Sequence, residues 1–293
     1  MEQFDDIGRL EEALLRTSYL PDRGLATALF LALKVRKPLL LEGEAGVGKT
    51  EAAKAVAAVL SSRLIRLQCY EGLDVAHAVY EWNYTRQLLH IRAVQESAAV
   101  EEDELFGPKF LIRRPLLEAI TSREPVVLLI DEIDRADDEF EAFLLELLSD
   151  FQITIPEIGT VAAHTRPVVI LTSNRTRELH DALKRRCLFH WIGHPSLERE
   201  VEIVRLRVLE VTERLAAEAV RFVQGLRRLD LAKPPGVAET VDWAQALAAL
   251  GRQELDADVV HATLGSVLKY YEDLDLVRDE TLAGLLEEAR AER

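Results

Sequence analysis

The stretch that decides the fold is Gly43-Glu44-Ala45-Gly46-Val47-Gly48-Lys49-Thr50, a glycine-rich loop that ends in a lysine and a threonine. A short apolar run, Leu39–Leu41, precedes it, and an alanine-rich helical pattern, Lys49–Leu60, follows it. Glycines let such a strand–loop–helix segment wrap its main-chain N–H groups around phosphate oxygens, and the helix adds its positive N-terminal end. Lys49 is expected to contact the β- and γ-phosphates of ATP, and the Thr50 hydroxyl is expected to bind Mg²⁺.

An acidic pair, Asp131-Glu132, directly follows the unbroken apolar run Val126–Ile130. The carboxyl end of a buried parallel strand faces the same crevice as the phosphate-binding loop. Asp131 is therefore expected to hold Mg²⁺, directly or through water, and Glu132 to orient and polarise the attacking water. The alternative is that the pair only caps the next helix, but the loop upstream favours the catalytic interpretation. The residues expected to bind the nucleotide are Gly43, Glu44, Ala45, Gly46, Val47, Gly48, Lys49, Thr50, Glu51 and Asp131.

Further apolar runs alternate with helical patterns, which predicts a parallel sheet with helices on both faces. These runs are Leu64–Leu67, Val168–Thr172 and Leu188–Ile192. Two segments break the alternation: a long, partly polar insertion around 84–115 and a β-hairpin over 152–163. Only helical patterns follow residue 195. The sequence thus predicts an α/β domain over 1–194 and a smaller all-helical domain over 195–293.

The overall charge of −15 and the pI near 5.0 disfavour general nucleic-acid binding, because an acidic surface repels phosphate backbones. No apolar run approaches the ~20 residues of a membrane span. The two cysteines, Cys69 and Cys187, form no disulfide framework and no metal-binding spacing. We therefore expect a cytoplasmic protein without a metal site built from side chains alone.

The strings GEAGVGKT, VVLLIDEID, LTSN and ALKRRC resemble AAA+ ATPases over Leu39–Trp191. The insertion and the hairpin are similar to those of the MoxR branch of that family. The resemblance implies a P-loop αβα sandwich with a helical lid, and a ring of identical subunits, with six expected. It makes Asn174 the sensor-1 residue that contacts the γ-phosphate or the lytic water.

The same resemblance places an arginine finger at Arg185 or Arg186, after a helix expected over Thr176–Lys184, with Arg186 slightly favoured. Such an arginine would reach the nucleotide of a neighbouring subunit. One departure from the family is the opening of the lid helix, Pro234–Thr240, which lacks the usual sensor-2 arginine. Another lid residue could serve, such as Arg227 or Arg228, or the role is absent.

Strings such as TIPEIGT and PPGVAETVDWAQAL resemble, more narrowly, the ATPases that accompany molybdenum-dependent carbon monoxide dehydrogenases. This implies a chaperone-like ATPase, a metalloenzyme client and a partner with a von Willebrand factor A domain. Two other functions stay open: an AAA+ motor acting on nucleic acid or on another protein complex, and a small-molecule kinase. The acidic net charge disfavours a motor that acts on nucleic acid. The paired arginines disfavour a small-molecule kinase, because a monomeric kinase needs no arginine directed at a neighbouring subunit. Phe110 in the insertion is open between a pore-facing aromatic and a core residue.

Overall fold

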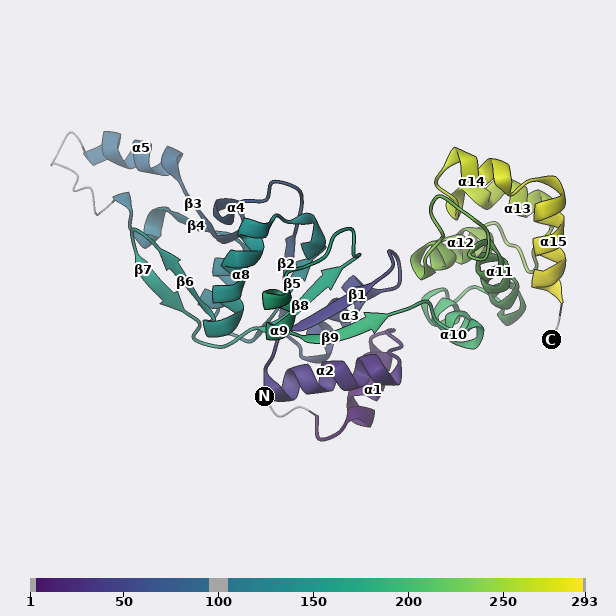
Figure 1. Ribbon diagram of the computed structural model, residues 1–293, viewed down its shortest axis with the longest axis horizontal. Coiled ribbons are helices and arrows are strands. Elements are labelled where there is room, and N and C mark those ends of the chain that lie inside the picture. Colours follow the sequence, from purple (N-terminus) through teal and green to yellow (C-terminus); the bar gives the residue numbers. More distant parts are fainter. Residues whose placement is uncertain (1–3, 95–104, 292–293) are drawn as a thin grey trace. The chain divides into compact units, whose positions relative to one another are not determined.

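The computed structural model describes residues 4–94 and 105–291 (Figure 1). The chain forms two compact units. The first comprises Met1–Thr17, Pro21–Glu42 and Thr50–Trp191, and the second comprises Ser18–Leu20, Gly43–Lys49 and Ile192–Arg293. The acidic middle of the expected insertion, residues 101–104, lies outside the described residues.

The first unit is built on a five-stranded sheet with the order β2-β5-β8-β1-β9. These strands are β2 (Arg63–Gln68), β5 (Val126–Asp131), β8 (Val168–Ser173), β1 (Leu39–Gly43) and β9 (Leu188–Ile192). The pairs β2–β5, β5–β8 and β8–β1 are parallel. Every residue of β1 and β5 is buried, as expected for central strands covered on both faces. The predicted α/β fold with a parallel sheet is therefore confirmed.

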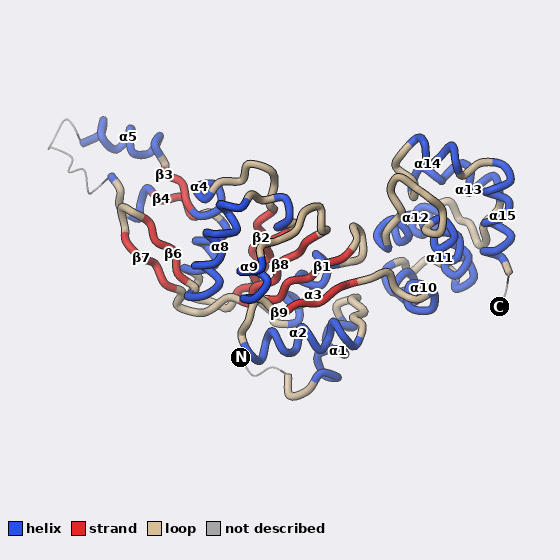
Figure 2. The backbone as a smooth tube through the Cα atoms, in the orientation of Figure 1, coloured by secondary structure: helices blue, strands red, loops and turns tan. Residues whose placement is uncertain are grey.

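Helices and two small antiparallel pairs surround this sheet (Figure 2). The helices are α1 (Ile7–Arg16), α2 (Arg23–Val35), α3 (Lys49–Val59), α4 (Val75–Val79), α5 (Tyr84–Val94), α7 (Pro115–Thr121), α8 (Asp138–Asp150) and α9 (Asp181–Arg186), with short 3₁₀ turns η1 (Pro108–Phe110) and η2 (Ile133–Arg135). The small pairs are β3 (Tyr80–Trp82) with β4 (Leu111–Arg113), and β6 (Gln152–Ile155) with β7 (Gly159–Ala162). Leucines of α7 and Phe140 and Leu144 of α8 pack into the core with the strands. Phe110 is 2% exposed, which makes it a core residue of this region and not a pore-facing aromatic.

The second unit is helical after residue 192. Its elements are α10 (Leu197–Arg207), α11 (Glu213–Leu226), α12 (Val237–Ala249), α13 (Ala257–Thr263), η3 (Leu264–Ser266), α14 (Tyr271–Leu276) and α15 (Asp279–Arg290). Phe222 and Trp243, both fully buried, stack at a tilt in the middle of its core. Within residues 4–94 and 105–291, no helix is long and apolar enough to cross a membrane.

Candidate functional site

Asp131 is the centre of a polar cluster in the first unit. It ends β5 and is 1% exposed. Its Oδ1 accepts hydrogen bonds from the Thr50 hydroxyl at 3.0 Å and from the Thr172 hydroxyl at 2.5 Å. Thr50 lies in the first turn of α3, and Thr172 lies on β8, the strand beside β5. A hydroxyl and a carboxylate at this separation are the hard oxygen ligands that Mg²⁺ takes in proteins, so the donor set fits that ion.

Arg66 binds the other oxygen of the same carboxylate. Its Nε and one terminal nitrogen donate to Asp131 Oδ2 at 2.9 and 2.5 Å. The sheet register explains the contact: Gln68 is aligned with Asp131, and Arg66 is two residues before Gln68, so all three side chains leave the same face. From the sequence alone, this segment is expected only to form a strand. The one signal for the contact is a single arginine near the end of an apolar run.

Glu132 is oriented differently from its neighbour. Its backbone is left-handed, with φ of 56°, a conformation that is unfavourable for a residue with a side chain. The Thr172 hydroxyl accepts a hydrogen bond from Glu132 N at 2.9 Å, which fixes this turn. The carboxylate is 32% exposed and forms an ion pair with Arg135 Nε at 2.8 Å. The acidic pair is thus divided into a buried carboxylate and an accessible one, which suits the separate roles expected for them.

Asn174 directly follows β8, and Asp134 anchors it. Asp134 is 2% exposed and accepts a hydrogen bond from Asn174 N at 3.1 Å. It also accepts from the backbone N and the hydroxyl of Thr176, at 2.8 and 2.7 Å. Because β8 pairs with β5 in parallel, Asn174 comes at the same sheet edge as the acidic pair. Asp134, the last residue of the string DEID, was not predicted as a site residue from the sequence.

The glycine-rich loop is packed within the second unit. Gly46 and Gly48 have φ of 77° and 96°, where a side chain would be strained. The Lys49 ammonium, 6% exposed, donates to the carbonyl oxygens of Gly43 at 2.8 Å and Glu44 at 2.6 Å. The loop therefore folds around the Lys49 ammonium. The next residue in the chain, Thr50, contacts Asp131.

The two arginines after Lys184 lie inside α9, not after it. The expected helix over 176–184 is wrong at its start, because the bonds from Thr176 to Asp134 hold that segment as a loop and α9 begins only at Asp181. Arg186 donates to the Ser149 hydroxyl at 2.6 Å and to the Ala182 carbonyl at 3.0 Å. Arg185 is exposed, and its side chain has no hydrogen bond or ion pair among the described residues.

Arg227, one of the two lid residues named as a replacement for the sensor-2 arginine, is buried in the second unit. It donates to both oxygens of Glu200 at 2.7 Å and to the carbonyl of Pro235 at 2.7 Å. Thr240 donates to the same Glu200 carboxylate at 2.8 Å. Arg228, the other residue named, pairs with Glu288 on the surface. The contacts of Arg227 are those of a structural ion pair.

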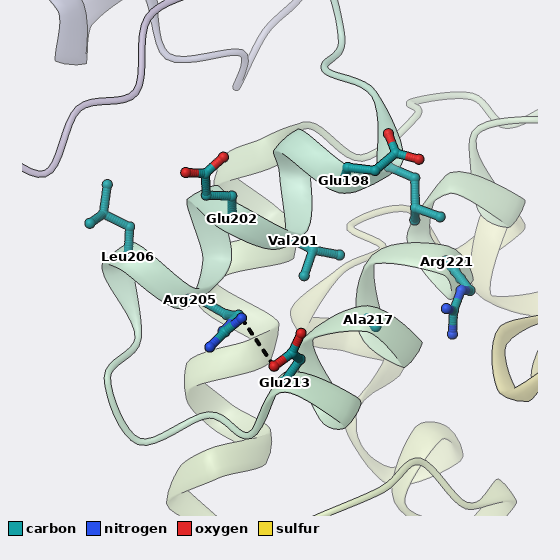
Figure 3. A pocket seen from close by; sticks show the side chains of 9 residues that line it. Glu198, Val201, Glu202, Arg205, Leu206, Glu213, Ala217 and Arg221 are labelled. Carbon is teal, nitrogen blue, oxygen red and sulfur yellow. Dashed lines mark ion pairs between the residues drawn. The ribbon is translucent and has the colours of Figure 1, made fainter. Parts of the chain in front are cut away.

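The second unit also carries a groove of about 600 Å³ between α10 and α11 (Figure 3). Glutamates and arginines line it, and Arg205 pairs there with Glu213 at 3.2 Å. None of the residues expected to bind the nucleotide lines this groove.

Neither cysteine has the properties of a reactive thiol. Burial, with the nearby charge of Asp131, raises the pKa of the Cys69 thiol to about 12. Burial also raises the pKa of Cys187 to about 12. A thiol with so high a pKa stays protonated at neutral pH and is a poor nucleophile and metal ligand. In the described part of the chain, no group of His, Cys, Asp and Glu side chains could hold a metal ion by itself.

Comparison with known proteins places the chain in a family. The family model described as "AAA domain (dynein-related subfamily)" matches residues 38–187. The chaperone protein ClpB of Rhodopirellula baltica is 29% identical over 232 residues, 69% of this chain but only 23% of ClpB. An uncharacterized protein of Staphylococcus aureus (strain NCTC 8325) is 25% identical over 211 residues, 70% of this chain and 72% of that protein.

Among solved structures, a mutant of RuvB from Thermotoga maritima is similar with a TM-score of 0.49 and 20% identity, covering 83% of this chain and 67% of that one. A second structure, described as the Thermotoga maritima RuvB Holliday junction branch migration motor, has a TM-score of 0.46 and 19% identity, covering 87% and 68%. The family match spans the glycine-rich loop, the acidic pair and Asn174. The chain belongs to the AAA domain family, in its dynein-related subfamily.

Proposed function

We propose that this protein binds ATP with Mg²⁺, hydrolyses it, and uses the cycle to remodel a protein client. The observation that carries the proposal is that the Thr50 and Thr172 hydroxyls both contact the buried carboxylate of Asp131. Thr50 directly follows the glycine-rich loop that ends in Lys49. Phosphoryl transfer to water requires mainly positioning and neutralisation of charge. This chain supplies a buried oxygen cluster and a lysine for those two tasks.

The proposed roles follow from exposure and position. Thr50 and Asp131 would hold Mg²⁺. When it is bound, this ion neutralises negative charge on the phosphates. Glu132, the accessible carboxylate, would accept a proton from the attacking water, after release from Arg135. Asn174, at the end of the next strand, would orient that water or the γ-phosphate. Residues Gly43 to Glu51 would wrap the phosphates.

Residues 1–194 would form the nucleotide-binding domain and residues 195–293 the lid. We propose a homo-oligomeric ring, with six subunits expected and an arginine of α9 acting on the neighbour's nucleotide. We further propose that the protein is of the MoxR type and matures a metalloenzyme, with a molybdenum hydroxylase such as carbon monoxide dehydrogenase as the client. A partner with a von Willebrand factor A domain would connect the ring to that client. The resemblance of the sequence strings supports these narrower assignments.

Two substitutions test the ATPase directly. Glu132→Gln is expected to bind ATP normally and to hydrolyse it about 10²- to 10⁴-fold more slowly, because the amide cannot accept the proton. Lys49→Ala is expected to lose most ATP affinity, because the phosphate charge loses its partner. Calorimetry measures the binding, and phosphate release measures the turnover.

Matched controls are available on other elements of the first unit. Glu139→Gln removes an exposed carboxylate from the start of α8, and Lys34→Ala removes an exposed ammonium from α2. Both variants should behave like the wild type. Unchanged ATP affinity in Lys49→Ala, or wild-type turnover in Glu132→Gln, would refute the assignment of these residues.

A further inference from the structure

We propose that Arg66 is a displaceable counter-ion of Asp131, which competes with Mg²⁺ for that carboxylate and so sets the Mg²⁺ concentration at which the site loads. The inference rests on the proposed function, because it concerns the metal of the same site. It assigns a positioning role to Arg66, which the nucleotide-binding motifs do not include.

The charge of the cluster requires a cation beside Asp131. The Asp131 side chain is only 2% exposed, and a buried carboxylate without a cation is strongly unfavourable. Its partners Thr50 and Thr172 are neutral hydroxyls. Arg66 is therefore the group that neutralises Asp131 in the chain without metal, through two hydrogen bonds to Oδ2 at 2.9 and 2.5 Å.

The Arg66 side chain has room to move away from Asp131. The Arg66 side chain is 49% exposed, whereas the Asp131 side chain is 2% exposed. β2 is the terminal strand in the order of the sheet, so its outer side carries no further strand of this sheet. Arg66 also donates to Gln68 at 2.5 Å, a surface partner that would remain available after Arg66 leaves Asp131. One member of the pair can move into solvent, and the other is fixed.

Arg66 and Mg²⁺ are both cations and would repel each other at this carboxylate. Mg²⁺ held by Asp131 and Thr50 would share the Asp131 carboxylate with the guanidinium, and two cations repel each other strongly in a partly buried site. Loading the metal then requires Arg66 to withdraw, and the lost ion pair reduces the apparent Mg²⁺ affinity. The opposite role would be for Arg66 to stay and bind a phosphate. These two roles predict opposite signs for the effect of removing the arginine.

The experiment measures the affinity of a fluorescent ADP analogue over a range of Mg²⁺ concentrations, from EDTA upward. Because metal and nucleotide binding are linked, the Mg²⁺ midpoint of the affinity increase reports metal affinity. In Arg66→Gln, this midpoint is expected to fall about tenfold, as a partly exposed ion pair no longer competes. Arg66→Lys keeps the charge but loses the two-pronged geometry, so its midpoint should lie between those of wild type and Arg66→Gln.

The matched control is Arg63→Gln, three residues earlier on β2, where the arginine pairs with Glu118 on the surface. Its Mg²⁺ midpoint should equal that of the wild type. An unchanged or higher midpoint in Arg66→Gln would overturn the inference, and should that variant not fold, the same result in Arg66→Lys would do so. Failure of the wild type to bind the ADP analogue at any Mg²⁺ concentration would instead refute the proposed function.

Discussion

Each unit of this protein contains buried carboxylates held by arginines, and the Asp131–Arg66 and Glu200–Arg227 pairs differ in the exposure of the arginine. In the second unit, Glu200 is fully buried and Arg227 is 9% exposed. In the first unit, Asp131 is 2% exposed but Arg66 is 49% exposed. The two carboxylates are equally buried, so the pairs differ in the exposure of the arginine.

The surroundings of the two pairs explain this difference. Arg227 also donates to the Pro235 carbonyl and to the Thr240 hydroxyl, and Glu200 receives a further bond from Thr240, so every group has a fixed partner inside the helical unit. Among residues 4–94 and 105–291, Arg66 has only Gln68 as a second partner. A fully partnered buried pair contributes to the scaffold, because breaking it leaves an uncompensated charge. A pair with one exposed member can open, which is what a ligand site requires.

The exposure of an arginine also separates the two arginines of α9, and here we expect the largest effect, a loss of ATP hydrolysis. Arg186 is bound to Ser149 and Ala182, whereas Arg185 is exposed. Exposure therefore favours Arg185 as the finger, although sequence resemblance slightly favours Arg186. Arg185→Ala is expected to bind ATP but to hydrolyse it roughly 10³-fold more slowly, with a much smaller loss in Arg186→Ala.

Mixing experiments sharpen the test of the finger. A ring that combines Arg185→Ala with Lys49→Ala subunits contains some sites with an intact nucleotide pocket beside an intact finger, so part of the activity should return. A large loss confined to Arg186→Ala would show that exposure is the wrong criterion here. Mixed rings that form without any recovery would show that Arg185 does not act on a neighbour.

The same substitution in the two buried pairs gives the next largest effect. Arg227→Gln should lower the free energy of unfolding by about 3–5 kcal/mol, because it leaves the Glu200 charge buried. Arg66→Gln should cost roughly 1–2 kcal/mol, because Thr50 and Thr172 still bind Asp131 and the lost arginine was half-exposed. Thermal unfolding with and without Mg²⁺ and ADP measures both.

Ligand binding should separate the two variants further. Mg²⁺ with ADP is expected to remove most of the difference between Arg66→Gln and the wild type, since the metal replaces the missing charge. It should leave the deficit of Arg227→Gln in place. Arg228→Gln, which breaks the exposed pair with Glu288, is the control and should change stability by less than about 0.5 kcal/mol. Equal losses in Arg66→Gln and Arg227→Gln that ligand does not relieve would remove the distinction between the pairs.

The sequence predicted the parts of the molecule that depend on local pattern. The apolar run Val126–Ile130 predicted a buried strand, and the strand places Asp131 at its carboxyl end. The sequence did not predict Arg66 or Thr172 as partners of Asp131, because both contacts depend on which strands are neighbours and in which register. Asp134 was missed for a similar reason: it holds Thr176, which is 42 residues away.

The smallest expected effect concerns His194, which lies near the Glu200–Arg227 pair. Partial burial and then the charge of Arg227 lower the pKa of His194 below its usual 6.5, against the opposing charges of Glu200 and Glu44. The unfolded chain therefore binds a proton more readily, so the stability gained from neutral His194 is complete above pH 6.5 and is lost as the pH falls through the lower folded pKa. Between pH 7.5 and 5.5, the melting temperature of the wild type should fall by roughly 1 °C more than that of His194→Gln, a small effect because the ring is only partly buried and solvent screens its charge. NMR titration of the His194 ring measures the pKa directly. A value at or above 6.5 would show that partial burial and the Arg227 charge together do not outweigh the opposing charges of Glu200 and Glu44.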